Sequence, residues 1–207
     1  KVLVPFDGNN GRNGQGVPFQ VGGDLYGLTN YGTYTSGTGK GILFKYNIAG
    51  DTITRMRTFG NVAPGYYPSG ELVPSTAGKY LILMRTGGDN SFAGAIAEYT
   101  LATNTITGVA SFDRPLNGTA PRGNLKKSSV NGKYYGITGY GGSGDFGTLF
   151  EYDPANNDTL INKHSFSPSD NGKTPTGTLA ENPSGEMLAI NPDDYGKKSY
   201  RAILDVG

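Results

Sequence analysis

The sequence predicts an all-β protein: a β-propeller of four blades, each made of four antiparallel strands. Three observations predict this fold. Four landmarks recur about every 53 residues, and each recurring segment is short, rich in Tyr, Phe, Leu, Ile and Val, and bounded by Gly, Asn, Asp or Pro. No window shows a convincing helical period. Four short strands per repeat make one propeller blade, whereas the rungs of a β-solenoid, the competing fold, are shorter at about 20–30 residues.

The landmarks give the order of the strands within each repeat. The first begins at Gly16, Gly70, Gly123 and Gly177; the second reads DLYGLT, KYLILM, KYYGIT and EMLAIN; the third reads ILFKY, AIAEY, TLFEY and AILDV; and the fourth ends at Phe6, Phe59, Phe112 and Phe166, at steps of 53, 53 and 54. By analogy with kelch blades, we expect these segments to follow one another from the propeller axis outwards.

A single domain over residues 1–207 is therefore expected, with blades at approximately 16–60, 70–113, 123–167, and 177–207 plus 1–7. The inward-facing residues are predicted to include Leu25, Leu43, Leu72, Ile96, Leu125, Leu149, Leu179 and Leu188. The last repeat supplies three strands, and Lys1–Phe6 matches the fourth. The N-terminal strand is therefore predicted to complete the last blade of its own chain. Donation of this strand to a neighbouring subunit, giving a dimer or a filament, is the alternative.

Composition excludes several classes of protein. The chain has no cysteine, which excludes a disulfide scaffold, a thiol nucleophile and a cysteine-ligated metal. A single histidine, His164, excludes a site with two imidazoles from this chain. The formal net charge of +1 gives no footprint for nucleic acid, and there is no apolar run of about 18 residues to span a membrane.

The segments DLYGLT, ILFKY and TFG, together with the Pro-x-Gly-x-Leu pattern, resemble the GloVer tandem repeat of bacterial surface and secreted proteins. The resemblance covers nearly the whole chain, and the strand order is also similar to that of a kelch blade. Ile82 departs from the pattern, because Gly27 and Gly136 stand at the same place in other repeats. The resemblance implies an exported protein, at the cell surface or outside the cell.

Candidate ligand-contacting residues lie on the long loops. If strands alternate in direction, the loops between the second and third strands and the loops between blades open on one face, and these are the long ones. We call this the long-loop face. Function tends to sit on loops that a rigid scaffold carries, and tyrosine suits sugar rings and protein partners. The candidates are Tyr31, Tyr34, Tyr66, Tyr67, Tyr140 and Tyr195.

Other motifs have a simpler structural interpretation. Asp7-Gly8-Asn9-Asn10-Gly11 offers oxygens for calcium at its first and third positions, but turn chemistry also explains it. The string Gly139–Gly144 precedes a strand, as a hairpin loop does, and does not precede a helix as a phosphate cradle does. His164 has no nearby catalytic partner in the sequence, and no carboxylate recurs on the inner strands. We therefore expect no catalytic residue and no cofactor, with calcium as the alternative.

These observations favour a non-catalytic extracellular module for binding, adhesion or surface structure, whose protein or glycan partner contacts the long-loop face. A carbohydrate-active propeller enzyme is the first alternative, and it needs two carboxylates in one cleft. The second alternative is a structural subunit of a strand-exchanged assembly or filament.

Overall fold

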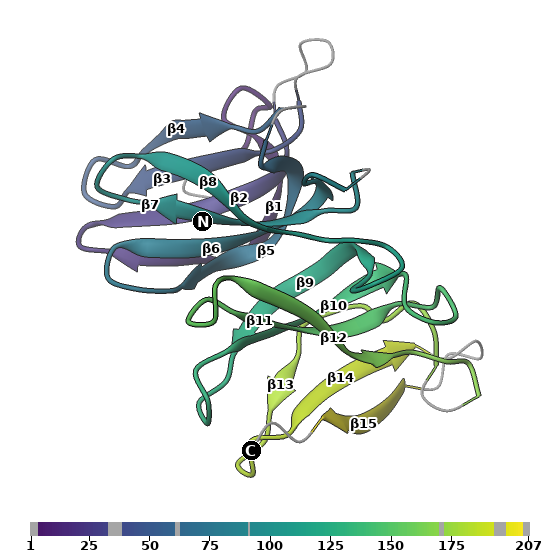
Figure 1. The fold of residues 1–207 in the computed structure, drawn as a ribbon. Helices are drawn as coiled ribbons and strands as arrows, with labels where there is room; N and C mark the ends of the chain where they lie inside the picture. Colours follow the sequence, from purple (N-terminus) through teal and green to yellow (C-terminus); the bar gives the residue numbers. More distant parts are fainter. Residues whose placement is uncertain are drawn as a thin grey trace.

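A computed structural model describes residues 4–32, 39–60, 63–90, 92–169, 172–192 and 198–204 (Figure 1), with the backbone alone from residue 190 onwards. Every regular element in this part of the chain is a strand, and the strands form four antiparallel sheets. An all-β fold with repeated blade-like sheets is thus confirmed.

Three of the sheets have four strands each, in chain order, as predicted. The first contains β1 (Arg12–Val21), β2 (Asp24–Tyr31), β3 (Ile42–Asn47) and β4 (Thr52–Thr58); the second β5 (Gly65–Pro74), β6 (Lys79–Gly87), β7 (Ala95–Thr100) and β8 (Thr105–Ser111); and the third β9 (Thr119–Lys127), β10 (Tyr134–Tyr140), β11 (Thr148–Asp153) and β12 (Thr159–Ser165).

The fourth sheet differs from the prediction. It has three strands in the described residues: β13 (Ala180–Glu181), β14 (Met187–Pro192) and β15 (Lys198–Leu204). The expected pairing of the N-terminal strand with this sheet is not seen for the described residues Val4–Phe6. Phe6 instead contacts Phe44 of β3 in the first sheet, with ring centroids 5.3 Å apart. The first and fourth sheets lie at opposite ends of the array (Figure 1).

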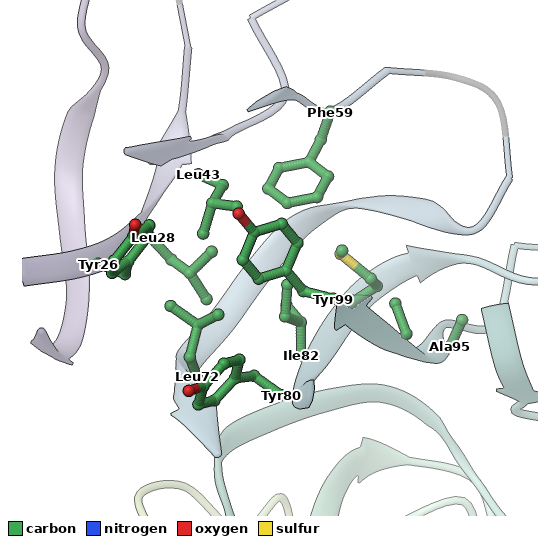
Figure 2. Close-up of a cluster of buried hydrophobic side chains, with 11 residues drawn as sticks. Tyr26, Leu28, Leu43, Phe59, Leu72, Tyr80, Ile82, Ala95 and Tyr99 are labelled. Atoms are coloured by element: carbon green, nitrogen blue, oxygen red, sulfur yellow. The ribbon is translucent and has the colours of Figure 1, made fainter. Parts of the chain in front are cut away.

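Apolar residues on alternating strand positions bury the faces between successive sheets. Side chains of the first and second sheets meet in one cluster, shown in Figure 2, which includes Leu28, Leu43 and Tyr99. A second cluster joins the second sheet to the third, and a third cluster joins the third to the fourth. Six of the eight predicted inward residues are buried, whereas Leu25 and Leu188 are half-buried.

A repeated backbone hydrogen bond fastens each sheet to the one before it. The N–H of Tyr67 donates to the Lys40 carbonyl at 2.8 Å, and the equivalent bonds are Ala120 to Ala93 at 2.9 Å and Thr174 to Phe146 at 2.7 Å. All three donors have positive φ, between 52° and 55°. The next residue is proline in each case, and it packs against a glycine of the preceding sheet: Pro68 on Gly41, Pro121 on Gly94 and Pro175 on Gly147.

A row of glycines brings the innermost strands together. A Cβ on Gly16 would lie 2.8 Å from the Gly70 carbonyl carbon, and a Cβ on Gly70 would meet the Gly123 oxygen. A Cβ on Gly123 would in turn meet the Gly177 oxygen, while no described atom lies within 4 Å of the Cβ position on Gly177. Only glycine allows so close an approach of two backbones, and the four φ values are all positive.

Glu151 of β11 is buried and forms an ion pair with Lys133, which directly precedes β10 and is partly exposed. The Glu151 carboxylate is 2.8 Å from Lys133 Nζ and accepts a hydrogen bond from the Tyr135 hydroxyl at 2.8 Å. Burial alone would raise the pKa of Glu151, but the bonds from Lys133 and Tyr135 outweigh burial and hold the pKa below its usual value. Burial of the Tyr135 hydroxyl, together with the nearby Glu151 carboxylate, raises the pKa of Tyr135 to about 12.

The Glu151→Gln substitution is therefore expected to change how stability depends on pH. A carboxyl group with a lowered pKa in the folded state stabilises the protein above its unfolded pKa, near 4.5, and this contribution disappears as the pH falls through the folded value. The variant should lose about 1–3 kcal/mol at neutral pH, and less in acid. Urea unfolding measured across this pH range tests the expectation, and equal losses at all pH values would contradict it.

Candidate functional site

Three of the predicted tyrosines come together where the first and second sheets meet on the long-loop face. Tyr31 ends β2, and Tyr66 and Tyr67 lie near the start of β5. The Tyr31 and Tyr67 rings are 5.5 Å apart and the Tyr66 and Tyr67 rings 5.0 Å apart, in both cases edge to face. We call Tyr31, Tyr66 and Tyr67 the tyrosine cluster.

Two cations complete the surface of the tyrosine cluster. The Arg12 guanidinium lies 5.0 Å from the centroid of the Tyr31 ring, and Lys40 Nζ lies 3.9 Å from that of Tyr66. The sequence interpretation missed both cations. Arg12 is the first residue of β1 and Lys40 lies in the loop before β3, and nothing in the sequence shows that they stack on these rings.

The junction between the two sheets holds the tyrosine cluster in place. Tyr67 is the residue whose N–H bonds to the Lys40 carbonyl, so the backbone that carries one ring is fixed to the loop that carries one cation. Asn30, beside Tyr31, donates from Nδ2 to the Pro68 carbonyl at 3.4 Å. Tyr31 is 38% exposed, and Tyr66 also packs against the buried cluster beneath. The rings thus form a supported surface that ligands can reach.

The remaining predicted tyrosines are not part of this cluster. Tyr140 ends β10 in the third sheet and is 41% exposed, with the Arg122 guanidinium 5.4 Å from its ring centroid. The cation reaches this ring from a different position than Arg12 does, because Arg12 is paired with Tyr31 in its sheet whereas Tyr140 is paired with Thr119. Tyr34 and Tyr195 lie outside the described residues.

The Asp7–Gly11 loop has the structure of a turn held by its own side chains. Asp7 Oδ1 accepts hydrogen bonds from the N–H groups of Asn9 at 2.8 Å and Asn10 at 3.0 Å. Asn10 Oδ1 accepts in return from the Asp7 N–H at 2.9 Å. The Asn10 and Asn9 N–H groups lower the pKa of Asp7. In the described part of the chain, no three His, Asp or Glu side chains are grouped so that they could hold a metal ion.

A polar pocket lies between long loops of the second and third sheets. Asp89, Asp113, Arg114 and Thr119 are among its lining residues. Asp113 Oδ1 is buried and has no hydrogen-bond partner among the described residues, whereas Asp89 Oδ2 accepts a hydrogen bond from the Ser111 hydroxyl at 3.0 Å. Asp89 and Asp113 are 24 residues apart in the sequence and line the same pocket only because the fold brings their loops together, so the sequence did not predict this pair.

His164 lies on β12, at the outer edge of the third sheet, as the sequence predicts. Its ring is 5.5 Å from that of Phe166. The described segments contain no helix that is long and apolar enough to cross a membrane.

Comparison with solved structures shows similarity to domains of larger proteins. The extracellular domain of the putative one-component system BT4673 from B. thetaiotaomicron matches with a TM-score of 0.58 and 13% identity, over 93% of this chain and 22% of that one. TolB from Acinetobacter baumannii matches with a TM-score of 0.49 and 10% identity, over 86% and 37%. The tricorn protease matches with a TM-score of 0.31 and 12% identity, over 89% and 22%. The chain therefore spans well under half the length of these proteins.

Because the identity to the BT4673 domain is only 13%, this match supports the fold alone. No curated protein sequence matches the chain. The family model described as the Gloeobacter/Verrucomicrobia repeat matches residues 1–202, which is nearly the whole chain and every copy of the repeat found in the sequence. The protein belongs to the Gloeobacter/Verrucomicrobia repeat family.

Proposed function

We propose that this chain is a non-catalytic binding module outside the cell, in which four β-propeller blades carry a glycan-binding surface on the long-loop face. The tyrosine cluster with Arg12 and Lys40 is the proposed contact surface. Aromatic rings bury the apolar faces of sugars, while their hydroxyls and the adjacent cations can bond to hydroxyl and carboxylate groups. The same chemistry could serve a protein partner, which makes a protein the alternative ligand.

One observation carries this proposal: three tyrosine rings from two sheets are in edge contact and have cations on two of them. A core would bury such rings completely, yet Tyr31 is 38% exposed. Partly exposed aromatic side chains on a stiff backbone lose little conformational entropy when they bind, so they are typical of the residues that dominate binding energy.

Removing rings from the tyrosine cluster should weaken binding to a glycan identified on an array of polysaccharides. Tyr31→Ala combined with Tyr67→Asn is the variant of choice, because asparagine tolerates the φ of 55° at position 67 and stands at the equivalent position 13 with φ 58°. We expect a loss of about 2 kcal/mol, or about thirtyfold in Kd, by titration calorimetry.

Tyr140→Ala is the matched control, since it removes an exposed tyrosine from the same face but outside the tyrosine cluster. An equal loss in the control would show that the cluster is not the binding surface. If the chain binds no glycan on the polysaccharide array but binds proteins on a separate protein array, the ligand is a protein.

The pocket with Asp89 and Asp113 favours a second candidate, a carbohydrate-active enzyme. Two carboxylates in one pocket are the minimum for glycoside hydrolysis, and Arg114 and Thr119 could orient a substrate there. Release of reducing sugar from a bound polysaccharide by the wild-type chain, lost in Asp113→Asn, would replace the non-catalytic proposal. Binding without release of sugar would support it.

A further inference from the structure

The junctions between successive sheets share one backbone design but differ in their side chains. In each, the residue before a glycine accepts a backbone hydrogen bond from a residue with positive φ in the next sheet. At the first junction along the chain, Lys40 accepts and Tyr67 donates. At the second, Ala93 accepts from Ala120 at 2.9 Å. Since the second junction forms with alanine at both positions, the fold does not require the side chains of Lys40 and Tyr67.

The side chains that distinguish the first junction are a lysine and two aromatic rings. Lys40 Nζ lies 3.9 Å from the centroid of the Tyr66 ring, whose edge contact with Tyr67 continues the aromatic surface. Thr119 stands at the position of Tyr66 in the second junction, where a polar pocket lies between the loops instead. A role in ligand binding accounts for side chains that the junction itself does not need.

Lys40 also differs from other lysines of the chain in what surrounds its charge. The ammonium groups of Lys45, Lys79 and Lys133 each lie within 3.4 Å of a carboxylate of the same sheet. Among the residues that the structure describes, no carboxylate lies within 4 Å of Lys40 Nζ. Residues 33–38, which belong to the same loop as Lys40, include no Asp or Glu in the sequence. A tyrosine ring attracts a cation without neutralising it, so this positive charge is left for a ligand.

We infer that the glycan bound by the long-loop face is acidic, with a carboxylate that pairs with Lys40 Nζ while its sugar ring packs on the tyrosine cluster. This inference rests on the proposed glycan-binding function and adds the chemical class of the glycan. A lysine ammonium has three N–H donors, and a carboxylate is the acceptor that forms the strongest hydrogen bonds with it. Polyuronates suit this surface because they carry a carboxylate on their sugar rings.

The hydration of Lys40 explains why an acidic glycan is favoured over a neutral one. Lys40 is half-buried beside the Tyr66 ring, and a bound sugar would remove further water from its ammonium group. A neutral sugar covers this charge without balancing it, which costs free energy, whereas a carboxylate compensates for the lost hydration. Screening by salt is also weaker for a partly buried pair than for an exposed one.

Polysaccharides that differ only in charge test the inference. Polygalacturonate, alginate and hyaluronate are each titrated beside the methyl ester of the same polymer, because esterification removes the charge but keeps the sugar and its linkage. At least one of the three acids should bind, and its Kd should be about tenfold lower than that of its ester. Equal or tighter binding of the ester would overturn the inference, as would binding of neutral glycans with none of the three acids. Both results would leave the glycan-binding proposal intact, whereas binding to no glycan at all would overturn both.

Lys40→Ala tests whether Lys40 is the group that pairs with the carboxylate. The variant should keep the circular dichroism spectrum of the wild type, because Ala93 holds the equivalent position in the second junction. Its Kd for the acid should rise about tenfold, to the value for the ester, while its Kd for the ester stays unchanged. Lys40→Arg keeps the charge and should keep the preference for the acid.

Lys127→Ala is the matched control for the removal of a lysine that contacts a tyrosine ring. Lys127 is exposed and its Nζ lies 5.4 Å from the centroid of the Tyr134 ring, but it ends β9 at the end of the sheet away from the long loops. It should bind the acid and the ester as the wild type does. A loss in Lys127→Ala equal to that in Lys40→Ala, or a Lys40→Ala variant that still prefers the acid tenfold, would overturn the pairing of Lys40 with the carboxylate.

Discussion

Replacing Gly123 with alanine is expected to destabilise the protein by about 2–5 kcal/mol. Gly123 has a φ of 69°, a conformation that costs an L-residue about 1–2 kcal/mol. Its Cβ position also meets the Gly177 oxygen, which belongs to the backbone of the next inner strand and cannot rotate away as a side chain can. Two packed sheets would have to move apart, and overpacking of this kind costs about 1–3 kcal/mol more.

Gly132→Ala separates the two causes. Gly132 has a φ of 73°, close to that of Gly123, but no atom of the described residues lies within 4 Å of its Cβ position. The free energy of unfolding of Gly132→Ala should therefore fall only by the cost of a positive φ for alanine, about 1–2 kcal/mol. Equilibrium unfolding in urea measures both variants against the wild type. Equal losses would show that the row of inner glycines does not govern how closely the sheets approach.

The inner glycines also show how far the fold follows from the sequence. Gly16, Gly70, Gly123 and Gly177 were recognised because they recur, and small residues were expected near the axis. The order of the strands within a sheet follows from the same repeat, because short connections join neighbouring antiparallel strands. Contacts that recur in every repeat are thus accessible from one sequence.

Structural features that occur only once in the chain could not be predicted from the repeat. Leu25 was predicted to face inward, and its repeat equivalents Tyr80 and Tyr134 are buried. Leu25 is only half-buried, because no preceding sheet packs against the first repeat in the described structure. The Lys40 contact with Tyr66 depends on how a loop of one sheet lies over the next, which no local pattern describes. The described candidate tyrosines, which the sequence placed on loops, lie at the ends of strands, and the sequence did not predict which of them meet.

The Phe112→Ala substitution should be at least as damaging as the loss of an inner glycine, at about 3–5 kcal/mol. Phe112 is fully buried between the second and third sheets, where its ring meets Phe150 at 4.9 Å. Removing the ring leaves a cavity lined by two rigid sheets, and such surroundings relax little. Urea unfolding should therefore show a large fall in the midpoint.

Phe6→Ala is the counterpart beside the first sheet, because Phe6 has the same place in the repeat and meets Phe44 edge to face, but is 40% exposed. For a monomeric chain it should cost only about 1 kcal/mol, since much of the ring already contacts water. Unfolding midpoints in urea, measured for both variants against the wild type, test this difference. A Phe6→Ala loss as large as that of Phe112→Ala would show that the exposure of the ring does not govern its contribution to stability.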